Sequence, residues 1–284
     1  MPLETELRHA LSALPIVASR LFLTTPGVAA TVPMIRGVFG AALRAEDETA
    51  YQRVFVGGDT PWNRLPTYLM RPASRDIPDP PALEFLRFGN GFAHEHAFER
   101  AWRRAAVMGL GKARQPFTIR RIDPLGANGA IGPATPWRAD QIPWPLPPGA
   151  PCRLVFPAPL RLLRHKRLIT APTLPDLIDH ALRRLAGLAD MGGARLAALA
   201  PACRAAAEAT PATPWRGRPL DLLRYSGAQK QEVELRGITG SVALPHGPGP
   251  LWPLLAALIW THLGKGTVFG LGQMLIAPQD ESAK

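Results

Sequence analysis

One pattern occurs twice in this chain of 284 residues: a helix with an apolar face, a glycine-rich turn, and then a strand. In the first half the helix carries Phe98, Ala101, Trp102 and Ala105 at helical spacing, which predicts one buried face. The helix, turn and strand are expected at 95–107, 108–114 and 116–122 in the first half, and at 251–263, 264–273 and 274–277 in the second. The repeated pattern therefore predicts two related units.

Each half also opens with a strand and a helix, and a further strand candidate precedes the repeated pattern. These segments are 16–23, 33–44 and 83–88 in the first half, and 153–156, 175–189 and 233–244 in the second. Thr173 is expected to cap the helix that follows it, and Gly237 and Gly240 predict a bulge. The order strand, helix, strands, helix, strand is that of a ferredoxin-like unit. We therefore predict an α+β fold with two ferredoxin-like domains in tandem.

Proline and glycine cluster between Asp123 and Pro151, where neither a long helix nor a central strand fits. We place the domain boundary near the end of this stretch, so that the domains span residues 1–150 and 151–284. A second such stretch, Thr210–Pro219, is expected to form a loop inside the second domain.

The charge balance favours a polyanionic partner. Lys and Arg number 33 against 22 Asp and Glu, giving a formal net charge of +11. A surplus of this sign binds nucleic acid by releasing counterions. Nearly all of it is arginine, which grips phosphates bidentately and stacks on bases. A GC-rich genome explains the scarcity of lysine equally well, although it does not explain the net sign.

Two cysteines, Cys152 and Cys203, lie far apart and suggest neither a disulfide framework nor a zinc site. His94 and His96 are two apart, so on a helix they point away from each other and cannot share a metal. The N-terminus lacks the basic start of a signal peptide, and the apolar run 251–263 is too short to span a bilayer. We expect a cytoplasmic protein without metal, cofactor or membrane contact.

The glycine-rich turn at 264–273 has the spacing G-x-G-x-x-x-G-x-G. It follows a helix instead of opening one, so a dinucleotide-binding site is not indicated, and it lacks the order of a P-loop. A tight structural turn is one interpretation. The adjoining His262 and Lys265 favour a second, in which the backbone approaches a phosphate and Lys265 supplies charge.

The segment His262–Gln273 (HLGKGTVFGLGQ) resembles the C-terminal glycine-rich loop of RAMP-superfamily CRISPR endoribonucleases, which process repeat transcripts. Further segments are similar in the expected order across most of the chain: 35–44 (IRGVFGAALR), 108–114 (MGLGKAR), 156–162 (FPAPLRL), 182–185 (LRRL) and 224–226 (RYS). Each segment alone is a weak signal, and it is their order and spacing that carry the resemblance.

The resemblance implies two RAMP domains that hold CRISPR repeat RNA on a basic face and cut it 3′ of a hairpin. It also implies cleavage without metal: the 2′-hydroxyl attacks the adjacent phosphate and leaves a 2′,3′-cyclic phosphate. Such an enzyme would stay bound to its product and work beside other Cas proteins. The competing hypothesis is a non-catalytic RAMP subunit that binds guide RNA in an effector complex.

The chain departs from the better-known relatives in one respect, because residues 10–87 contain no histidine where the family often places its catalytic base. Either His262 or another histidine serves instead, or arginines position and stabilise the reacting phosphate, or the protein binds RNA and cuts poorly. The arginine version resembles the divergent processing enzymes of type IV CRISPR systems.

The candidate residues follow from these segments. The catalytic candidates are His262, Arg36, Arg44 and Tyr225. The RNA-binding candidates are Arg20, Lys112, Arg114, Arg161, Arg164, His165, Lys166, Arg167, Arg224, Lys265, Gly266, Gly270 and Gly272. Other interpretations stay open, namely a helix cap for His262, a buried tyrosine for Tyr225 and a solvated loop for 161–167.

Overall fold

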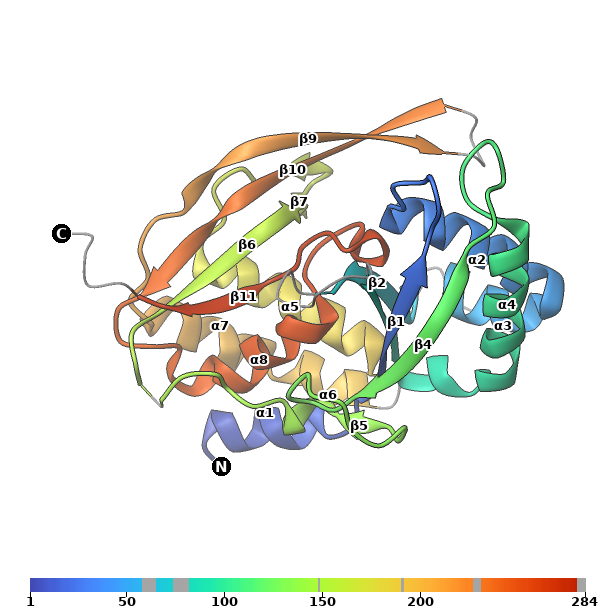
Figure 1. The fold of residues 1–284 in the computed structure, drawn as a ribbon. Helices are drawn as coiled ribbons and strands as arrows, with labels where there is room; N and C mark the ends of the chain where they lie inside the picture. Colours follow the sequence, from blue (N-terminus) through green and yellow to red (C-terminus); the bar gives the residue numbers. More distant parts are fainter. Residues whose placement is uncertain (58–64, 74–81, 148, 190–191, 227–230, 280–284) are drawn as a thin grey trace. The chain divides into compact units, whose positions relative to one another are not determined.

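The computed structural model describes residues 1–57, 65–73, 82–147, 149–189, 192–226 and 231–279. They form two compact units, each built around one antiparallel sheet (Figure 1). The first-sheet unit comprises Pro15–Trp137 together with Val268–Gly270. The second-sheet unit comprises Met1–Leu14, Arg138–Thr267 and the residues from Leu271 onward. The division near residue 150 stays a prediction about separable domains.

The first-sheet unit has the predicted order of elements. These are β1 (Pro15–Thr24), α2 (Val32–Glu46), α3 (Glu48–Tyr51), a π-helical turn (Gln52–Val56), β2 (Tyr68–Pro72), β3 (Ala82–Phe88), a 3₁₀ turn (Gly89–Phe92), α4 (Glu95–Met108) and β4 (Thr118–Leu125). The sheet runs β2-β3-β1-β4, and the short β5 (Trp137–Arg138) pairs with β1. Helices α2 and α4 cover one face of this sheet (Figure 1).

The second-sheet unit repeats this topology. Its main elements are β6 (Cys152–Leu160), α5 (Leu174–Leu188), β9 (Arg216–Ser226), β10 (Gln231–Leu244), α8 (Trp252–Thr261) and β11 (Leu275–Pro278). The sheet runs β11-β6-β10-β9, so in both units the last strand pairs with the first. This is the ferredoxin-like arrangement, and the predicted fold class is confirmed.

Smaller elements complete the second-sheet unit. They are α1 (Leu3–Leu11), a 3₁₀ turn (Ala139–Gln141), the hairpin β7 (Leu163–Arg164) and β8 (Arg167–Leu168), α6 (Gly193–Ala198), α7 (Ala200–Ala209) and 3₁₀ turns at Gly249–Leu251 and Thr267–Phe269. The helices lie on one face of the sheet (Figure 1). Helix α1 buries Leu7 and Leu11, which are four residues apart and so lie on one side of the helix.

Local sequence signals are confirmed at two positions. Thr173 caps α5 through a capping box, in which its backbone N–H donates to Asp176 Oδ2 at 3.1 Å. The register of β10 against β6 shifts between Ile238 and Gly240, as the glycines predicted.

The expected loop at Thr210–Pro219 is wrong over its last four residues. Strand β9 begins at Arg216 and passes through Pro219, which pairs with Ile238. A proline fits here because β9 is an edge strand, whose outer side needs no ladder donor.

Candidate functional site

Arg36 on α2 lies among three aromatic rings of the first-sheet unit. Its guanidinium carbon is 4.7 Å from the ring centre of Phe269, 5.2 Å from that of Phe55 and 5.8 Å from that of Tyr68. Such contacts stabilise a cation without neutralising it. Among the described residues no ion pair to Arg36 is found, and its buried Nε has no hydrogen-bond partner. Arg36 is therefore a preorganised cation that can still bind an anion.

The ring nearest to Arg36 comes from the glycine-rich turn. Val268 is buried in the core of the first-sheet unit, and Phe269 packs against that core. Gly270 has φ +79°, and a Cβ there would lie 3.2 Å from the carbonyl oxygen of Met70 on β2. A side chain at this position would press on the β2 backbone, so Gly270 allows the turn to pass close to the strand.

The remaining residues of the turn make a closed backbone structure in the second-sheet unit. The N–H of Leu263 donates to Gly272 O at 2.9 Å, and a Cβ on Gly272 would lie only 1.8 Å from Leu263 O. The N–H of Lys265 donates to Arg161 O at 3.0 Å, while its side chain is exposed. Gly266, at φ +79°, packs against Leu271. The glycines of the turn are explained by backbone geometry, and Lys265 is its exposed cation.

His262 is completely buried at the end of α8, where its φ is +57°. Its Nδ1 lies 3.1 Å from Leu271 O. This position matches the helix-capping interpretation, although a left-handed backbone is unusual for a residue other than glycine. A catalytic role of His262 stays a prediction, and its burial speaks against it.

Arg44 and Arg20 differ from Arg36 because each is already paired with a carboxylate. Arg44 is exposed and donates to Glu48 at 2.8 Å. Arg20 donates at 2.8 Å to Glu84, a buried carboxylate that also accepts from Arg71 at 2.7 Å. An anionic ligand would have to compete with these partners.

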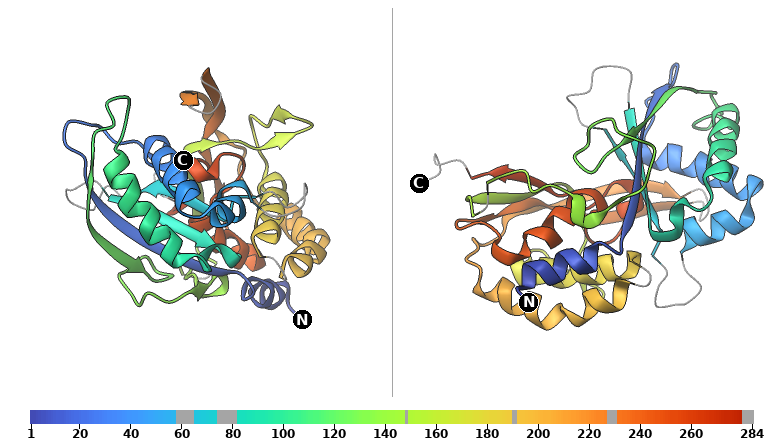
Figure 2. Two further views of the ribbon diagram at one scale, coloured as in Figure 1. Left: turned by 90° about the vertical axis from the view of Figure 1, so that its right-hand side faces the viewer. Right: turned by 90° about the horizontal axis from the view of Figure 1, so that it is seen from below.

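The predicted basic segment forms the tip of the β7–β8 hairpin, which stands away from the helices of its unit (Figure 2). Arg164, His165, Lys166 and Arg167 are all exposed. His165 and Lys166 have φ values of +49° and +64°, as the two central residues of a type I′ turn do. Asn and Gly are preferred there, so two strained residues of larger size present their side chains to solvent.

Arg164 of this hairpin and the nearby Arg161 are held in place. Arg164 forms an ion pair with Asp176, the third residue of α5 and a member of its capping box. Arg161 donates from Nε to Arg236 O at 2.6 Å. Both are therefore anchored to the second-sheet unit.

The other candidates contribute less. Lys112 and Arg114 are exposed in the turn between α4 and β4. Arg224 and Tyr225 lie on β9, but their side chains fall outside the described residues.

A comparison with known families finds a similarity over most of the second-sheet unit. Residues 154–274 match the family model of the CRISPR-associated endoribonuclease Cas6. Over these residues the chain is similar to the Cas6 family. The match includes β6, the basic hairpin and the glycine-rich turn, so the resemblance to CRISPR repeat-processing endoribonucleases is confirmed, whereas the type IV variety stays a prediction.

Solved Cas6 structures share the fold over nearly the whole chain. A Cas6 product complex is 17% identical with a TM-score of 0.58, covering 94% of this chain and 100% of that one. A Thermus thermophilus Cas6 is 15% identical with a TM-score of 0.55, covering 93% and 98%. A partial Cas6-RT-Cas1–Cas2 complex is 12% identical with a TM-score of 0.55, covering 95% of this chain and 47% of that one. No curated protein matches the chain.

Sequence reasoning missed Arg184, a buried arginine of α5. Its Nε donates to Thr261 O, the last carbonyl of α8, at 2.7 Å, and burial lowers its pKa to about 10. Arg184 follows Leu177 by seven residues, so helical spacing alone places it on the inward face. The aromatic surroundings of Arg36 were also missed, because its rings come from three separate segments.

In the described part of the chain, no group of three His, Cys, Asp or Glu residues is placed to hold a metal ion. Nor is any helix there long and apolar enough to cross a membrane.

Proposed function

We propose that the protein is an endoribonuclease that cleaves CRISPR repeat RNA 3′ of a hairpin and keeps the product bound. The observation that carries this proposal is the match of residues 154–274 to the Cas6 family. The ferredoxin-like topology of both units supports it, as does the net charge of +11.

The proposed reaction is an internal transesterification of the RNA. The 2′-oxygen forms a bond to the adjacent phosphorus and the bond to the 5′-oxygen breaks, leaving a 2′,3′-cyclic phosphate and a 5′-hydroxyl. The proton of the 2′-hydroxyl leaves to a base, and the departing 5′-oxygen takes up a proton. The phosphorane between these states carries extra negative charge, which a fixed cation stabilises.

We assign that stabilisation to Arg36. Its guanidinium is held by three rings and has no carboxylate partner among the described residues, so a phosphate meets no competing anion there. A guanidinium also offers two parallel N–H groups to phosphate oxygens. Because arginine is a poor base at neutral pH, this assignment implies catalysis by positioning and charge, with water or RNA groups relaying the protons.

RNA binding is assigned to the exposed cations of the second-sheet unit, above all the β7–β8 hairpin and Lys265. Contacts of this kind go to phosphates, so affinity should fall steeply with salt. Assembly with other Cas proteins is proposed by analogy with the solved Cas6-RT-Cas1–Cas2 complex. The buried, unbonded Cys152 and Cys203 are compatible with the reducing cytoplasm.

The test is incubation of the purified protein with the repeat RNA encoded beside its gene, in the presence of EDTA. A single cut that leaves a cyclic phosphate end is the expected result. Tight binding without a cut would instead support the non-catalytic RAMP subunit, and cleavage that requires added magnesium would overturn the metal-independent mechanism.

A further inference from the structure

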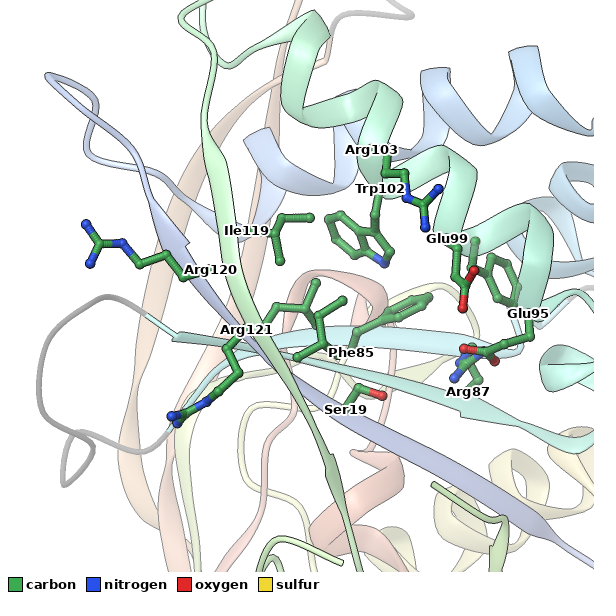
Figure 3. A pocket seen from close by; sticks show the side chains of 13 residues that line it. Ser19, Phe85, Arg87, Glu95, Glu99, Trp102, Arg103, Ile119, Arg120 and Arg121 are labelled. Atoms are coloured by element: carbon green, nitrogen blue, oxygen red, sulfur yellow. The ribbon is translucent and has the colours of Figure 1, made fainter. Parts of the chain in front are cut away.

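The first-sheet unit contains a pocket of about 470 Å³ between α4 and the strands β1, β3 and β4 (Figure 3). Its volume is within the range of small-molecule sites. The inner wall is apolar, formed by Leu21, Phe85, Phe98, Trp102 and Ile119. The side chains of Arg120 and Arg121 point away from the pocket, on the outer side of β4 (Figure 3).

The polar groups of the pocket gather at one side, along α4. Glu95, Glu99 and Arg103 follow one another at intervals of four residues, so they share one side of the helix. Arg87 reaches this side from β3 and donates to Glu95. Figure 3 shows the carboxylate of Glu99 and the guanidinium of Arg103 beside the Trp102 ring.

Arg87 is the unusual member of this group. It is 2% exposed, its guanidinium lies over the rings of Phe85 and Phe98, and its Nε has no hydrogen-bond partner among the described residues. Leaving a buried donor unsatisfied costs free energy, and native structures rarely do so without a reason. An acceptor on a bound ligand at this end of the pocket would remove that cost.

The charges indicate what kind of ligand fits. Four arginines and two glutamates line the pocket, but Arg120 and Arg121 point outward from β4 and Arg121 is paired with Asp123. On the polar side Arg87 and Arg103 are balanced by Glu95 and Glu99, which leaves no surplus positive charge for a phosphate. Apolar walls with both donors and acceptors on one side suit a flat, neutral ring with a mixed polar edge. Nucleobases have this character, and bases of single-stranded RNA are read in this way.

Carboxylates only accept hydrogen bonds, which selects among the bases. Guanine presents the acceptor O6 beside the two donors N1–H and N2–H₂. A single carboxylate can accept from both donors, while an arginine donates to O6. Glu99 is exposed, and among the described residues it has no ion-pair partner. We propose that this pocket binds a guanine base of the RNA, with Glu99 and Arg87 reading its edge. The proposal rests on RNA being the ligand, as in the proposed function.

The test is the fluorescence anisotropy of labelled RNA heptamers UUUGUUU, UUUIUUU, UUUAUUU and UUUUUUU at one salt concentration. All four carry the same phosphates, so differences in affinity report the central base. Inosine lacks only the N2 amino group, so G should bind about tenfold more tightly than I, the value of one hydrogen bond to a charged group.

Glu99→Gln should reduce the G-to-I ratio to near one, because an amide cannot accept from both donors. Glu208→Gln is the matched control, since Glu208 is an exposed helix residue of the second-sheet unit and the charge change is the same. Equal affinities for the four heptamers, or a ratio that survives Glu99→Gln, would refute the guanine pocket.

Cross-linking of a heptamer with 6-thioguanosine at its centre locates the base independently. Cross-linked peptides should fall within residues 85–122, and peptides found only elsewhere would place the base at another site. Cleavage of repeat RNA is measured separately. A preference for G without cleavage would support the guanine pocket and refute the proposed endoribonuclease activity. Cleavage without a preference for G would support the activity and refute the pocket.

Discussion

The two sheet units share one topology but differ in what fills their cores. The first-sheet unit buries the rings of Phe39, Phe55, Tyr68, Phe85, Phe98 and Trp102 in a single cluster. The second-sheet unit is packed mainly with aliphatic side chains, such as Leu177, Leu182, Leu254 and Leu258. The same backbone order is therefore compatible with two kinds of interior.

The difference shows in how each unit accommodates arginine. Arg36 and Arg87 lie against aromatic faces, and each keeps an unsatisfied Nε. Arg184 is buried and donates its Nε to the Thr261 carbonyl, while its Nη2 has no hydrogen-bond partner among the described residues. Aromatic rings can hold a cation without using its donors, whereas Arg184 uses its Nε to fix the end of α8. We infer that the first-sheet unit holds arginines ready for a ligand, while the second-sheet unit uses Arg184 as a clamp.

The largest expected effect is that of replacing Arg36, and it tests whether this arginine is available to the RNA. Arg36→Ala should lower the single-turnover rate of repeat cleavage by about 100-fold or more, because it removes a fixed cation from the phosphorane. Arg44→Ala, which loses only an exposed and paired arginine, should change the rate by less than about threefold. Equal losses of cleavage rate in both variants would show that Arg36 contributes no more to catalysis than Arg44. Thermal melting of both proteins controls for unfolding.

Arg184→Ala should instead act on stability. It leaves Thr261 O without its donor and opens a cavity, at a cost of about 3 kcal/mol in the free energy of unfolding. Arg183→Ala, one position along on the exposed face of α5, should cost less than about 0.5 kcal/mol. Chemical denaturation measures both values. A loss of free energy of unfolding in Arg184→Ala as small as that in Arg183→Ala would show that the hydrogen bond from Arg184 to Thr261 O does not stabilise the unit.

Gly272 of the second-sheet unit and Gly27 of the first-sheet unit have similar φ angles but different surroundings. Gly272→Ala forces a Cβ to 1.8 Å from Leu263 O at φ +66°, and should cost about 3 kcal/mol or more. Gly27→Ala has φ +69° but no atom within 4 Å, so only the backbone preference is lost, at about 1 kcal/mol. Similar losses in the two variants would contradict the tight backbone contact within the glycine-rich turn.

The β7–β8 hairpin should show a conflict between stability and RNA binding. The double variant His165→Asn/Lys166→Gly supplies the residues that a type I′ turn prefers and should gain about 1 kcal/mol of stability. It should also weaken RNA binding. The slope of the logarithm of the binding constant against the logarithm of the salt concentration should become shallower by about one, the value of one phosphate contact. Lys166→Gln, which removes the charge but keeps the strain, should weaken binding without stabilising the protein. Unchanged RNA affinity in both variants would show that the hairpin does not contact the RNA.

The smallest effect concerns the pH dependence of the second-sheet unit. Burial, followed by the charge of Arg183, lowers the pKa of His180 from 6.5 to about 4, against the opposing effect of Asp176 and Asp179. Between these values the unfolded chain binds more protons, so stability falls as the pH drops from about 6.5 to 4. In His180→Gln this fall should be smaller by about 1 kcal/mol, after allowance for solvent screening. Denaturation curves of both proteins at pH 7 and pH 4.5 measure the change in the free energy of unfolding between the two pH values. An equal change in His180→Gln and in the unsubstituted protein would contradict the lowered pKa of His180.

The sequence by itself determined the order of elements, because periodicity and capping are local signals. The helices at Pro33–Arg44 and Glu95–Val107 and the bulge at Gly240 were predicted within a few residues of their observed places. The strand in Arg216–Ser226 was partly missed, since Pro219 reads as a loop residue unless the strand is known to be at an edge.

Only the tertiary structure decided which cations are available. Arg20, Arg36 and Arg44 look alike in the sequence, yet two are paired with carboxylates and one lies among rings. The ring nearest to Arg36 belongs to Phe269, more than two hundred residues away. Likewise the pocket beside Arg87 exists because α4 and three strands meet there. Local patterns set what each segment becomes, but the state of a charged side chain depends on neighbours that the chain brings together only by folding.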